Sequence, residues 1–277
     1  MKNAALKIIG LVTLTFMVAC GNDPAAPMIT EIETSYIQDN QISSHVLTEV
    51  DYRNGNEIDF VSTYRDGQLS EQSSYYYDSE NDLVNRIDST YRESQVATML
   101  AEYDSNSNLS SLSRPSNSVT GSVRFRYKNG YLSSISSANF DFQLTYNQKN
   151  QLEMTESSDF SINFRWTDDV LTSLRTTNSY ETSKTEFFYN PEGKIYKTIV
   201  GTNESQIFYD EQGRIEEIST YFSGSNFRKI TTYRYADGTV AGAQPTPEFE
   251  GGIYFGMDGK PLAELPMITL KGFSIDD

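Results

Sequence analysis

The sequence offers little for catalysis, because it contains a single histidine, His45, and a single cysteine, Cys20. Zinc sites with several histidines, and iron sites with two histidines and a carboxylate, cannot be built from one imidazole. A Ser-His-Asp triad needs only one histidine, but no Gly-x-Ser-x-Gly motif is present to form its nucleophile turn. We therefore predict no catalytic residue and no enzyme, and we interpret His45 as an exposed strand residue.

Carboxylates could also do chemistry, since two of them about 5–10 Å apart can hydrolyse a glycosidic bond. Adjacent residues of a strand point to opposite faces, so neighbouring acids in this chain do not form such pairs by themselves. With 38 Asp and Glu residues some proximity is inevitable, and a solvated surface is the simpler interpretation. A carboxylate-dependent glycan hydrolase or lyase is the less favoured alternative, with candidate residues Asp168, Asp169, Glu216, Glu217, Glu248 and Glu250.

Two polar runs resemble the first half of a calcium loop, namely Asp104, Asn106, Asn108 and Asp78, Glu80, Asp82. Calcium takes six to eight oxygen ligands, and the EF-hand loop needs Gly at its sixth position and Glu at its twelfth. In the first run those positions hold Leu109 and Pro115. Asp, Asn and Ser also build turns for conformational reasons alone. We therefore favour turns, keep calcium as a weak alternative and expect no other cofactor.

The first twenty residues are interpreted as a lipoprotein leader. Lys2 and Lys7 precede an apolar core, and Met17-Val18-Ala19-Cys20 resembles a lipobox. The apolar stretch is shorter than the roughly 20 residues that a spanning helix needs. We predict a signal peptide over 1–19, a lipid on Cys20, and a tether over 20–43 that holds the protein at a membrane. A plain signal peptide or a transmembrane anchor is the alternative.

The residue after Cys20 indicates which membrane would hold the protein, and the net charge excludes one class of partner. In the lipoproteins that this segment resembles, an Asp at that position retains the protein at the inner membrane, whereas here it is Gly21. An outer-membrane lipoprotein is therefore favoured, on the periplasmic or the surface side. The net charge of −16 at pH 7 opposes binding to nucleic acid.

The fold that positions these groups is indicated by a sequence repeat. An aromatic residue, a polar turn and then Leu, Ile or Val recur about ten times along the chain. The gap from aromatic to aliphatic residue is five or six. Gaps of five hold dipeptides that suit a type I′ turn, namely Asp66-Gly67, Asn129-Gly130 and Asp237-Gly238. In a gap of six, Asn190 is expected to pair with Lys194 while Gly193 takes the left-handed conformation. Both gaps place the aromatic residue opposite the aliphatic one.

The segments that lead into the turns alternate between apolar and polar residues, which is typical of an antiparallel sheet with one apolar face. After the turn the aliphatic residues stand three apart, as Leu132 and Ile135 do. An odd offset keeps both on one face only if a bulge intervenes, so bulges are predicted there. Consecutive rings also break the alternation. We predict that three rings lie on the outer face as ligand-stacking residues: Tyr76, Phe188 and Phe208.

The repeated phrase resembles the YD repeat of Rhs-type shells, roughly Tyr-Asp-x-x-Gly-Arg-Leu-x-x-Ile. The stretch from Tyr209 to Ile218 matches nearly every position, and the stretch from Tyr189 to Ile195 matches most. The chain also looks like small YD-repeat-like lipoproteins of double-membrane bacteria. It is too short to enclose a toxin domain as an Rhs protein does.

We therefore predict an all-β fold, a long antiparallel meander of YD-like hairpins curled into a shell, half-barrel or wide barrel. The hairpin repeats cover residues 44–240, and residues 241–277 form a tail that could cover an open sheet edge. The favoured function is a non-catalytic, lipid-anchored envelope protein that binds a polysaccharide or a protein partner through its sheet surface. The alternative is a carrier of an apolar ligand such as a lipid.

Overall fold

The computed structural model describes residues 26–54, 57–79, 83–91, 95–113, 122–138, 141–158, 160–179 and 182–240. Every regular element within these ranges is a β-strand, and no helix in them is long and apolar enough to cross a membrane. The predicted leader, the lipidation site Cys20 and the tail 241–277 lie outside the described residues.

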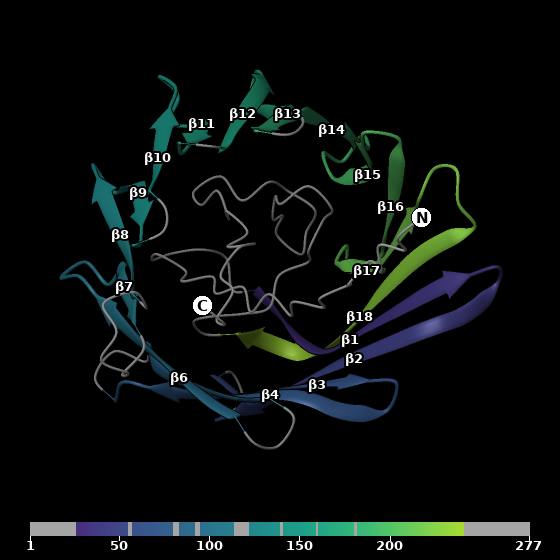
Figure 1. Ribbon diagram of the computed structural model, residues 1–277, viewed down its shortest axis with the longest axis horizontal. Helices are drawn as coiled ribbons and strands as arrows, with labels where there is room; N and C mark the ends of the chain where they lie inside the picture. The colour runs from purple at the N-terminus through teal and green to yellow at the C-terminus, as the bar shows by residue number, and fades with distance from the viewer. Residues whose placement is uncertain are drawn as a thin grey trace, which may run out of the picture.

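The strands form one closed ring, an up-and-down meander in which each strand pairs antiparallel with the next (Figure 1). The last strand, β18, pairs with β1 along twelve residue pairs, so the eighteen described strands leave no free sheet edge. The all-β meander is thus confirmed, in the form of a wide barrel. The strands are β1 Ala26–Gln38, β2 Gln41–Arg53, β3 Glu57–Arg65, β4 Gln68–Tyr77, β5 Val84–Tyr91, β6 Gln95–Tyr103, β7 Leu109–Ser113, β8 Ser122–Lys128, β9 Tyr131–Ser136, β10 Asp141–Tyr146, β11 Leu152–Glu156, β12 Phe160–Thr167, β13 Val170–Asn178, β14 Thr182–Tyr189, β15 Ile195–Val200, β16 Asn203–Tyr209, β17 Ile215–Tyr221 and β18 Phe227–Val240.

The ring begins before the boundary that the sequence indicated. Residues 26–43 were assigned to the tether, but they form β1 and the start of β2. Asp39 and Asn40, both with positive φ, make the two-residue turn between these strands. The tether is therefore corrected to end before residue 26. Because β1 closes the ring against β18, the tail 241–277 has no open edge of the described sheet to cover.

The two-residue and three-residue turns are confirmed with one exception. Asp66-Gly67 and Asn129-Gly130 have positive φ at both positions, as a type I′ turn requires. Gly193 has a φ of 79°, and the Asn190 amide donates to the Lys194 carbonyl at 2.8 Å. The exception is Asp237-Gly238, which lies within β18 at a register shift opposite Pro27 and Met28. The pairing of β18 with β1 keeps this dipeptide in an extended strand, so the predicted hairpin there is wrong.

The predicted bulges are present on the strands that follow the turns of the repeated phrase. Tyr127 pairs with Leu132 and Arg126 with Ser134, so Ser133 is the extra residue and Leu132 and Ile135 share a face. The Ser133 hydroxyl donates to the Arg126 carbonyl at 3.0 Å. Four other bulges repeat this hydrogen bond, from Ser43, Ser70, Ser110 and Thr172. The bulge interrupts the hydrogen bonds between the two strands. The hydroxyl of the extra residue thus donates to a backbone carbonyl that has no partner in the strand ladder.

The aromatic residues of the repeat link consecutive hairpins through their polar ends. The Tyr189 hydroxyl donates to the Leu171 carbonyl at 2.7 Å, and the Trp166 indole N–H donates to the Leu152 carbonyl at 2.7 Å. Each donor reaches an aliphatic residue of the preceding strand. The same bond is made by Tyr52, Tyr103, Tyr146, Tyr209 and Tyr235. Burial raises the pKa of Tyr103 and of Tyr146 to about 12, so these hydroxyls stay protonated donors at neutral pH.

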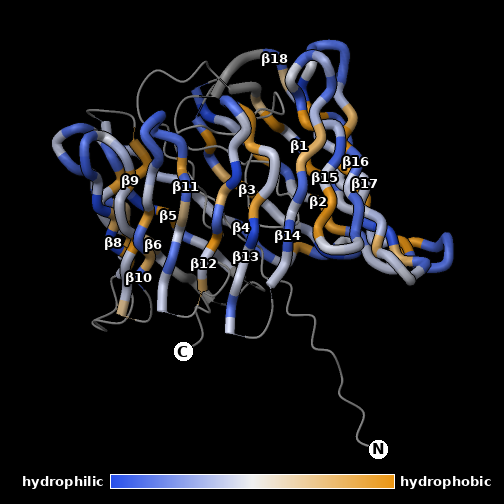
Figure 2. The backbone as a smooth tube through the Cα atoms, turned by 90° about the horizontal axis from the view of Figure 1, so that it is seen from above, coloured by the Kyte–Doolittle hydropathy of each residue, from blue (hydrophilic) through white to orange (hydrophobic). Residues whose placement is uncertain are grey.

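Aliphatic and aromatic residues of the repeat form three clusters on one face of the wall, called here the core face. Figure 2 shows the underlying alternation of hydrophobic and hydrophilic residues along the strands. The largest fully buried side chains of the described residues all lie on this face, among them Ile29, Ile195 and Ile215. Side chains converge on the concave side of a ring and splay apart on the convex side. The core face therefore lines the inside, and the opposite, outer face carries the charged residues.

Candidate binding surfaces on the outer face

The three rings that were predicted to face outward do lie on the outer face. Tyr75 and Phe187, on the core face, are only 5% and 6% exposed, whereas Tyr76 is 40% exposed and Phe208 is 46% exposed. Phe188 is half-buried, and it pairs with the outer-face residue Lys197. Strict alternation along β4, β14 and β16 produces this division.

The ring does not bring all three of these residues together. Phe188 on β14 and Phe208 on β16 are separated by one strand, whereas Tyr76 on β4 belongs to a different part of the wall (Figure 1). Tyr196, the bulge residue of β15, is 45% exposed between the first two. We call Phe188, Tyr196 and Phe208 the outer aromatic patch.

Cations already cover two of the predicted rings. The Arg86 guanidinium lies 4.4 Å from the centre of the Tyr76 ring, and the Lys197 ammonium lies 4.6 Å from that of Phe188. Arg86 is also held by Asp88, whose pKa the hydrogen bond from Arg86 lowers. Among the described contacts no cation covers Phe208, so Phe208 is the most open ring of the outer aromatic patch.

The candidate acids are engaged separately. Asp168 has a positive φ in the turn between β12 and β13, and Asp169 pairs with Lys149 at 3.2 Å. Glu217 accepts from the Ser219 hydroxyl at 2.5 Å and lies 3.9 Å from Arg228. Glu216 is exposed at the bulge of β17, and Glu248 and Glu250 lie outside the described residues.

His45, the single histidine, lies in β2 beside an acid of the neighbouring strand. Its Nε2 is 2.9 Å from Glu33, which also faces Arg234 at 3.8 Å. His45 is half-buried rather than fully exposed, because β1 and β3 flank it. Within the described residues no group of three or more His, Cys, Asp and Glu could hold a metal ion.

The first calcium candidate is a turn in which the carboxylate is fully used. Asp104 accepts the backbone amides of Asn106 at 2.8 Å and Asn108 at 3.0 Å, and the Asn108 side-chain amide at 3.1 Å. The Asn108 hydrogen bond lowers the pKa of Asp104. The amide of Asp78, in the second candidate, donates to Leu83 at 2.8 Å, while Glu80 and Asp82 lie outside the described residues. Calcium binding at either run stays a prediction.

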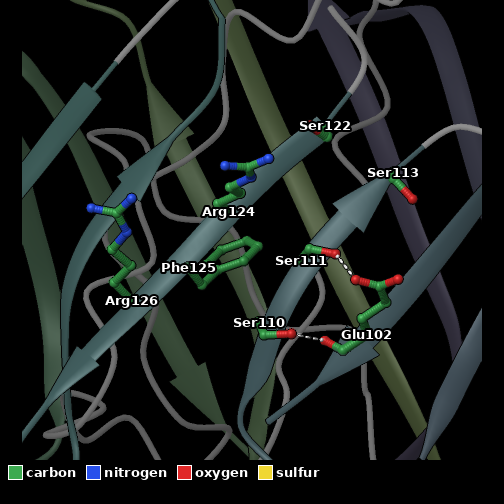
Figure 3. Close-up of a pocket in the computed structure, with 8 residues that line it drawn as sticks. All are labelled: Glu102, Ser110, Ser111, Ser113, Ser122, Arg124, Phe125 and Arg126. Carbon is green, nitrogen blue, oxygen red and sulfur yellow. Dashed lines mark hydrogen bonds between the residues drawn. The ribbon is translucent and has the colours of Figure 1, made fainter. Parts of the chain in front are cut away.

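A second outer surface was missed in the sequence. A groove of about 530 Å³ crosses β6, β7 and β8, and Figure 3 shows Arg124 and Arg126 projecting from one strand beside it. Its lining residues are Glu102, Ser110, Ser111, Ser113, Ser122, Arg124, Phe125 and Arg126. The signal was present in the alternation of β8, where Arg124, Arg126 and Lys128 share the outer face. The alternation predicts that this face of β8 is exposed to solvent. The groove itself becomes visible only in the structure, because β6 and β7 form the rest of it.

No protein-family model and no curated protein matches this sequence. Among solved structures, the chain is similar to a porin-like protein from Bacteroides uniformis, with a TM-score of 0.42 and 9% identity over 77% of this chain and 99% of that one. It is also similar to the Tc holotoxin pore of Photorhabdus luminescens, with a TM-score of 0.36 and 10% identity over 81% of this chain. A third similar structure, TcdB2–TccC3, has a TM-score of 0.33 and 11% identity over 80% of this chain.

The match spans only 17% and 18% of the two toxin chains. At these identities and TM-scores none of the three likenesses assigns a role to any residue of this chain.

Proposed function

We propose that the protein is a non-catalytic binding barrel of the cell envelope, which holds a polysaccharide or a protein partner on its outer face. The observation that carries the proposal is the outer aromatic patch. Phe208 is 46% exposed and Tyr196 is 45% exposed on neighbouring strands of a closed wall. Apolar side chains that gather in one exposed patch often mark a binding site, and ring faces suit the apolar faces of sugars.

The residues that surround the outer aromatic patch favour ligand binding over catalysis. Phe208 pairs with Glu217 and Phe188 with Lys197, so polar groups lie directly beside the rings. Such a mixture suits a hydroxyl-rich ligand, which offers donors and acceptors at its edge and C–H groups on its face. The closed ladder holds the rings in place, so little ordering entropy is lost on binding.

Binding to glycan arrays and to pulled-down envelope proteins tests the proposal. Phe208→Ala is expected to weaken binding about tenfold, the effect of losing one stacking contact. Leu69→Ala is the matched control, because Leu69 is 40% exposed on the outer face of β4, outside the patch. Equal affinities of the wild type and Phe208→Ala for every bound ligand would contradict a role for the patch.

The lipid anchor is a separate part of the proposal. Cys20 would carry the lipid and place the barrel at the outer membrane, and the lipobox-like Met17-Val18-Ala19 supports it. Metabolic labelling with a fatty acid is expected to mark the wild type and not Cys20→Ser. Label that persists in the variant would exclude this site.

Ring closure favours a second candidate, a carrier of an apolar ligand. A barrel of this strand number encloses more space than its wall side chains fill, and the core face turns rings such as Phe142 and Phe160 inward. Native mass spectrometry of protein purified from its host tests this function. A co-purified lipid supports the carrier, and its absence at full occupancy of the folded protein counts against it.

A further inference from the structure

We infer that the groove across β6–β8 is a second binding site, specific for an acidic oligosaccharide with carboxylate or sulfate groups. The inference deepens the proposed binding role of the outer face and rests on it. The groove lies on the opposite side of the ring from the outer aromatic patch (Figure 1), so the two sites can be tested separately.

Two arginines line the groove, and Lys128 continues their row along β8 beyond the lining residues. Arg124, Arg126 and Lys128 alternate with core-face residues in β8, which places neighbouring charges about 7 Å apart on the outer face. Within the described part of the chain neither arginine makes an ion pair or covers a ring.

The two acids that lie two strands away from Arg124, one on each side, make no ion pair with it among the described contacts, and each accepts from a neutral donor. On β6, Glu102 accepts from the Ser111 hydroxyl at 2.8 Å. On β10, Asp141 accepts from the Gln143 amide at 2.9 Å. Ser111 and Ser136, the direct neighbours of Arg124 on either side, are neutral. The groove therefore keeps two guanidinium groups available, and their planar forks bind carboxylate or sulfate oxygens in pairs.

The remaining lining favours a sugar over a lipid headgroup. Serine hydroxyls of β7 and β8 surround the arginines and can both donate to and accept from sugar hydroxyls (Figure 3). Phe125 is the one apolar lining residue and is partly buried against the core cluster, so the groove offers a single ring rather than an apolar surface to an acyl chain. A volume of about 530 Å³ suits a short oligomer, and the linear row of charges suits a linear one.

Titration of the full chain with fluorescently labelled probes tests the inference. The probes are oligogalacturonate, a sulfated dextran oligomer, neutral dextran and poly-glutamate. We expect the two acidic sugars to bind, neutral dextran to bind at least tenfold more weakly, and affinity to fall as salt rises. Arg124→Gln with Arg126→Gln is expected to weaken acidic sugar binding at least tenfold.

Arg165→Gln with Arg175→Gln is the matched control, because both residues are exposed on the outer faces of β12 and β13 and the charge change is the same. Circular dichroism checks that both double variants fold. Equal acidic sugar binding by the two double variants would overturn the site. Equal binding of poly-glutamate would overturn its specificity for sugars, and arginine-dependent binding of anionic vesicles alone would assign it to a lipid.

Phe208→Ala separates the two proposals. Acidic sugar binding that survives Phe208→Ala but not Arg124→Gln with Arg126→Gln supports the groove as a site of its own. Loss of all glycan binding in Phe208→Ala, with the double arginine variant unaffected, would overturn the groove while leaving the outer aromatic patch supported.

Discussion

The residue that follows the aromatic explains why Tyr-Asp and Tyr-Asn recur in this chain. Asn147 accepts the backbone amides of Lys149 at 2.8 Å and Gln151 at 3.0 Å, which closes the three-residue loop. Asp104, Asn190 and Asp210 do the same in their own loops. Asn and Asp close the loop equally, because each has a short side chain with an acceptor oxygen. The aspartate of the repeated phrase is therefore selected for its hydrogen bonds in the turn and not for its charge.

The aromatic hydroxyl that joins neighbouring repeats makes a measurable contribution. Tyr189→Phe removes the donor to the Leu171 carbonyl and leaves a buried acceptor unpaired, so we expect the free energy of unfolding to fall by about 1–3 kcal/mol. Tyr196→Phe is the control, because that ring is 45% exposed, and its effect should stay within about 0.5 kcal/mol. Urea unfolding followed by fluorescence measures both. Equal losses would show that the carbonyl bond is not the cause.

Asp104 gives the turn a dependence on pH. The Asn108 hydrogen bond lowers the pKa of this carboxyl below its ordinary value of 3.8. The unfolded chain then binds the proton more readily, so stability is present above the ordinary pKa and lost as pH falls through the lowered one. Asp104→Asn keeps the acceptor oxygen but does not titrate. Its urea midpoint should match the wild type at pH 7 and fall less between pH 5 and pH 2. The matched variant Asp169→Asn, at an exposed turn, should not reproduce this difference.

At the scale of the strand, the bulge reconciles an odd spacing with a single core face. Thr172 is the extra residue between Leu171 and Leu174, which are 2% and 1% exposed. Its hydroxyl donates to the Arg165 carbonyl at 3.0 Å. Bulges increase the local twist, and those that follow the turns of the repeated phrase help the sheet to curl into a ring.

Deletion of Thr172 should therefore be tolerated better than deletion within an unbulged strand. Without it Leu171 and Leu174 stand two apart and still share the core face, so we expect an ordinary loss of about 1–3 kcal/mol. Deletion of Asn163 in β12 moves Ile162 and Phe164 to opposite faces, which should prevent folding. Circular dichroism and thermal unfolding compare the two. Equal disruption would argue that the bulge is indispensable for closure.

The sequence predicts the local parts of this fold because they depend on neighbours in the chain. Turn type, bulges and the outward direction of Phe208 follow from φ preferences and from the period of two. The misassigned parts depend on distant partners. The Asp237-Gly238 dipeptide lies in a strand because β18 pairs with β1, and Ala26–Gln38 forms a strand because its backbone pairs with β18. The arginine groove was missed for the same reason, since its floor comes from three strands.

At the scale of the molecule, closure joins the two ends of the meander. The β1–β18 junction includes an ion pair between Glu31 and Arg234 at 3.0 Å and contact between the Thr34 and Thr231 hydroxyls at 3.1 Å. The Tyr52 hydroxyl donates to the Ile29 carbonyl at 2.7 Å, so β2 continues the same linkage. Without this junction β1 and β18 would expose unpaired backbone groups, a known route to aggregation.

A disulfide across the junction tests closure directly. Thr34→Cys with Thr231→Cys, in a Cys20→Ser background, brings together sulfurs 197 residues apart in sequence, at a hydroxyl separation that a disulfide can span. We expect it to form under mild oxidation, to change mobility on a non-reducing gel, and to stabilise the fold by about 4–5 kcal/mol because it closes so long a loop.

Thr48→Cys with Thr63→Cys is the matched control, across β2 and β3, with hydroxyls 3.3 Å apart and positions only 15 residues apart in sequence. That bond needs just one hairpin, so it forms whether the ring is closed or open, and it should stabilise by about 3 kcal/mol. Formation of both bonds fits the barrel. If the hairpin bond forms and the junction bond does not, the sheet is an open shell, and an inward core face would no longer enclose a ligand.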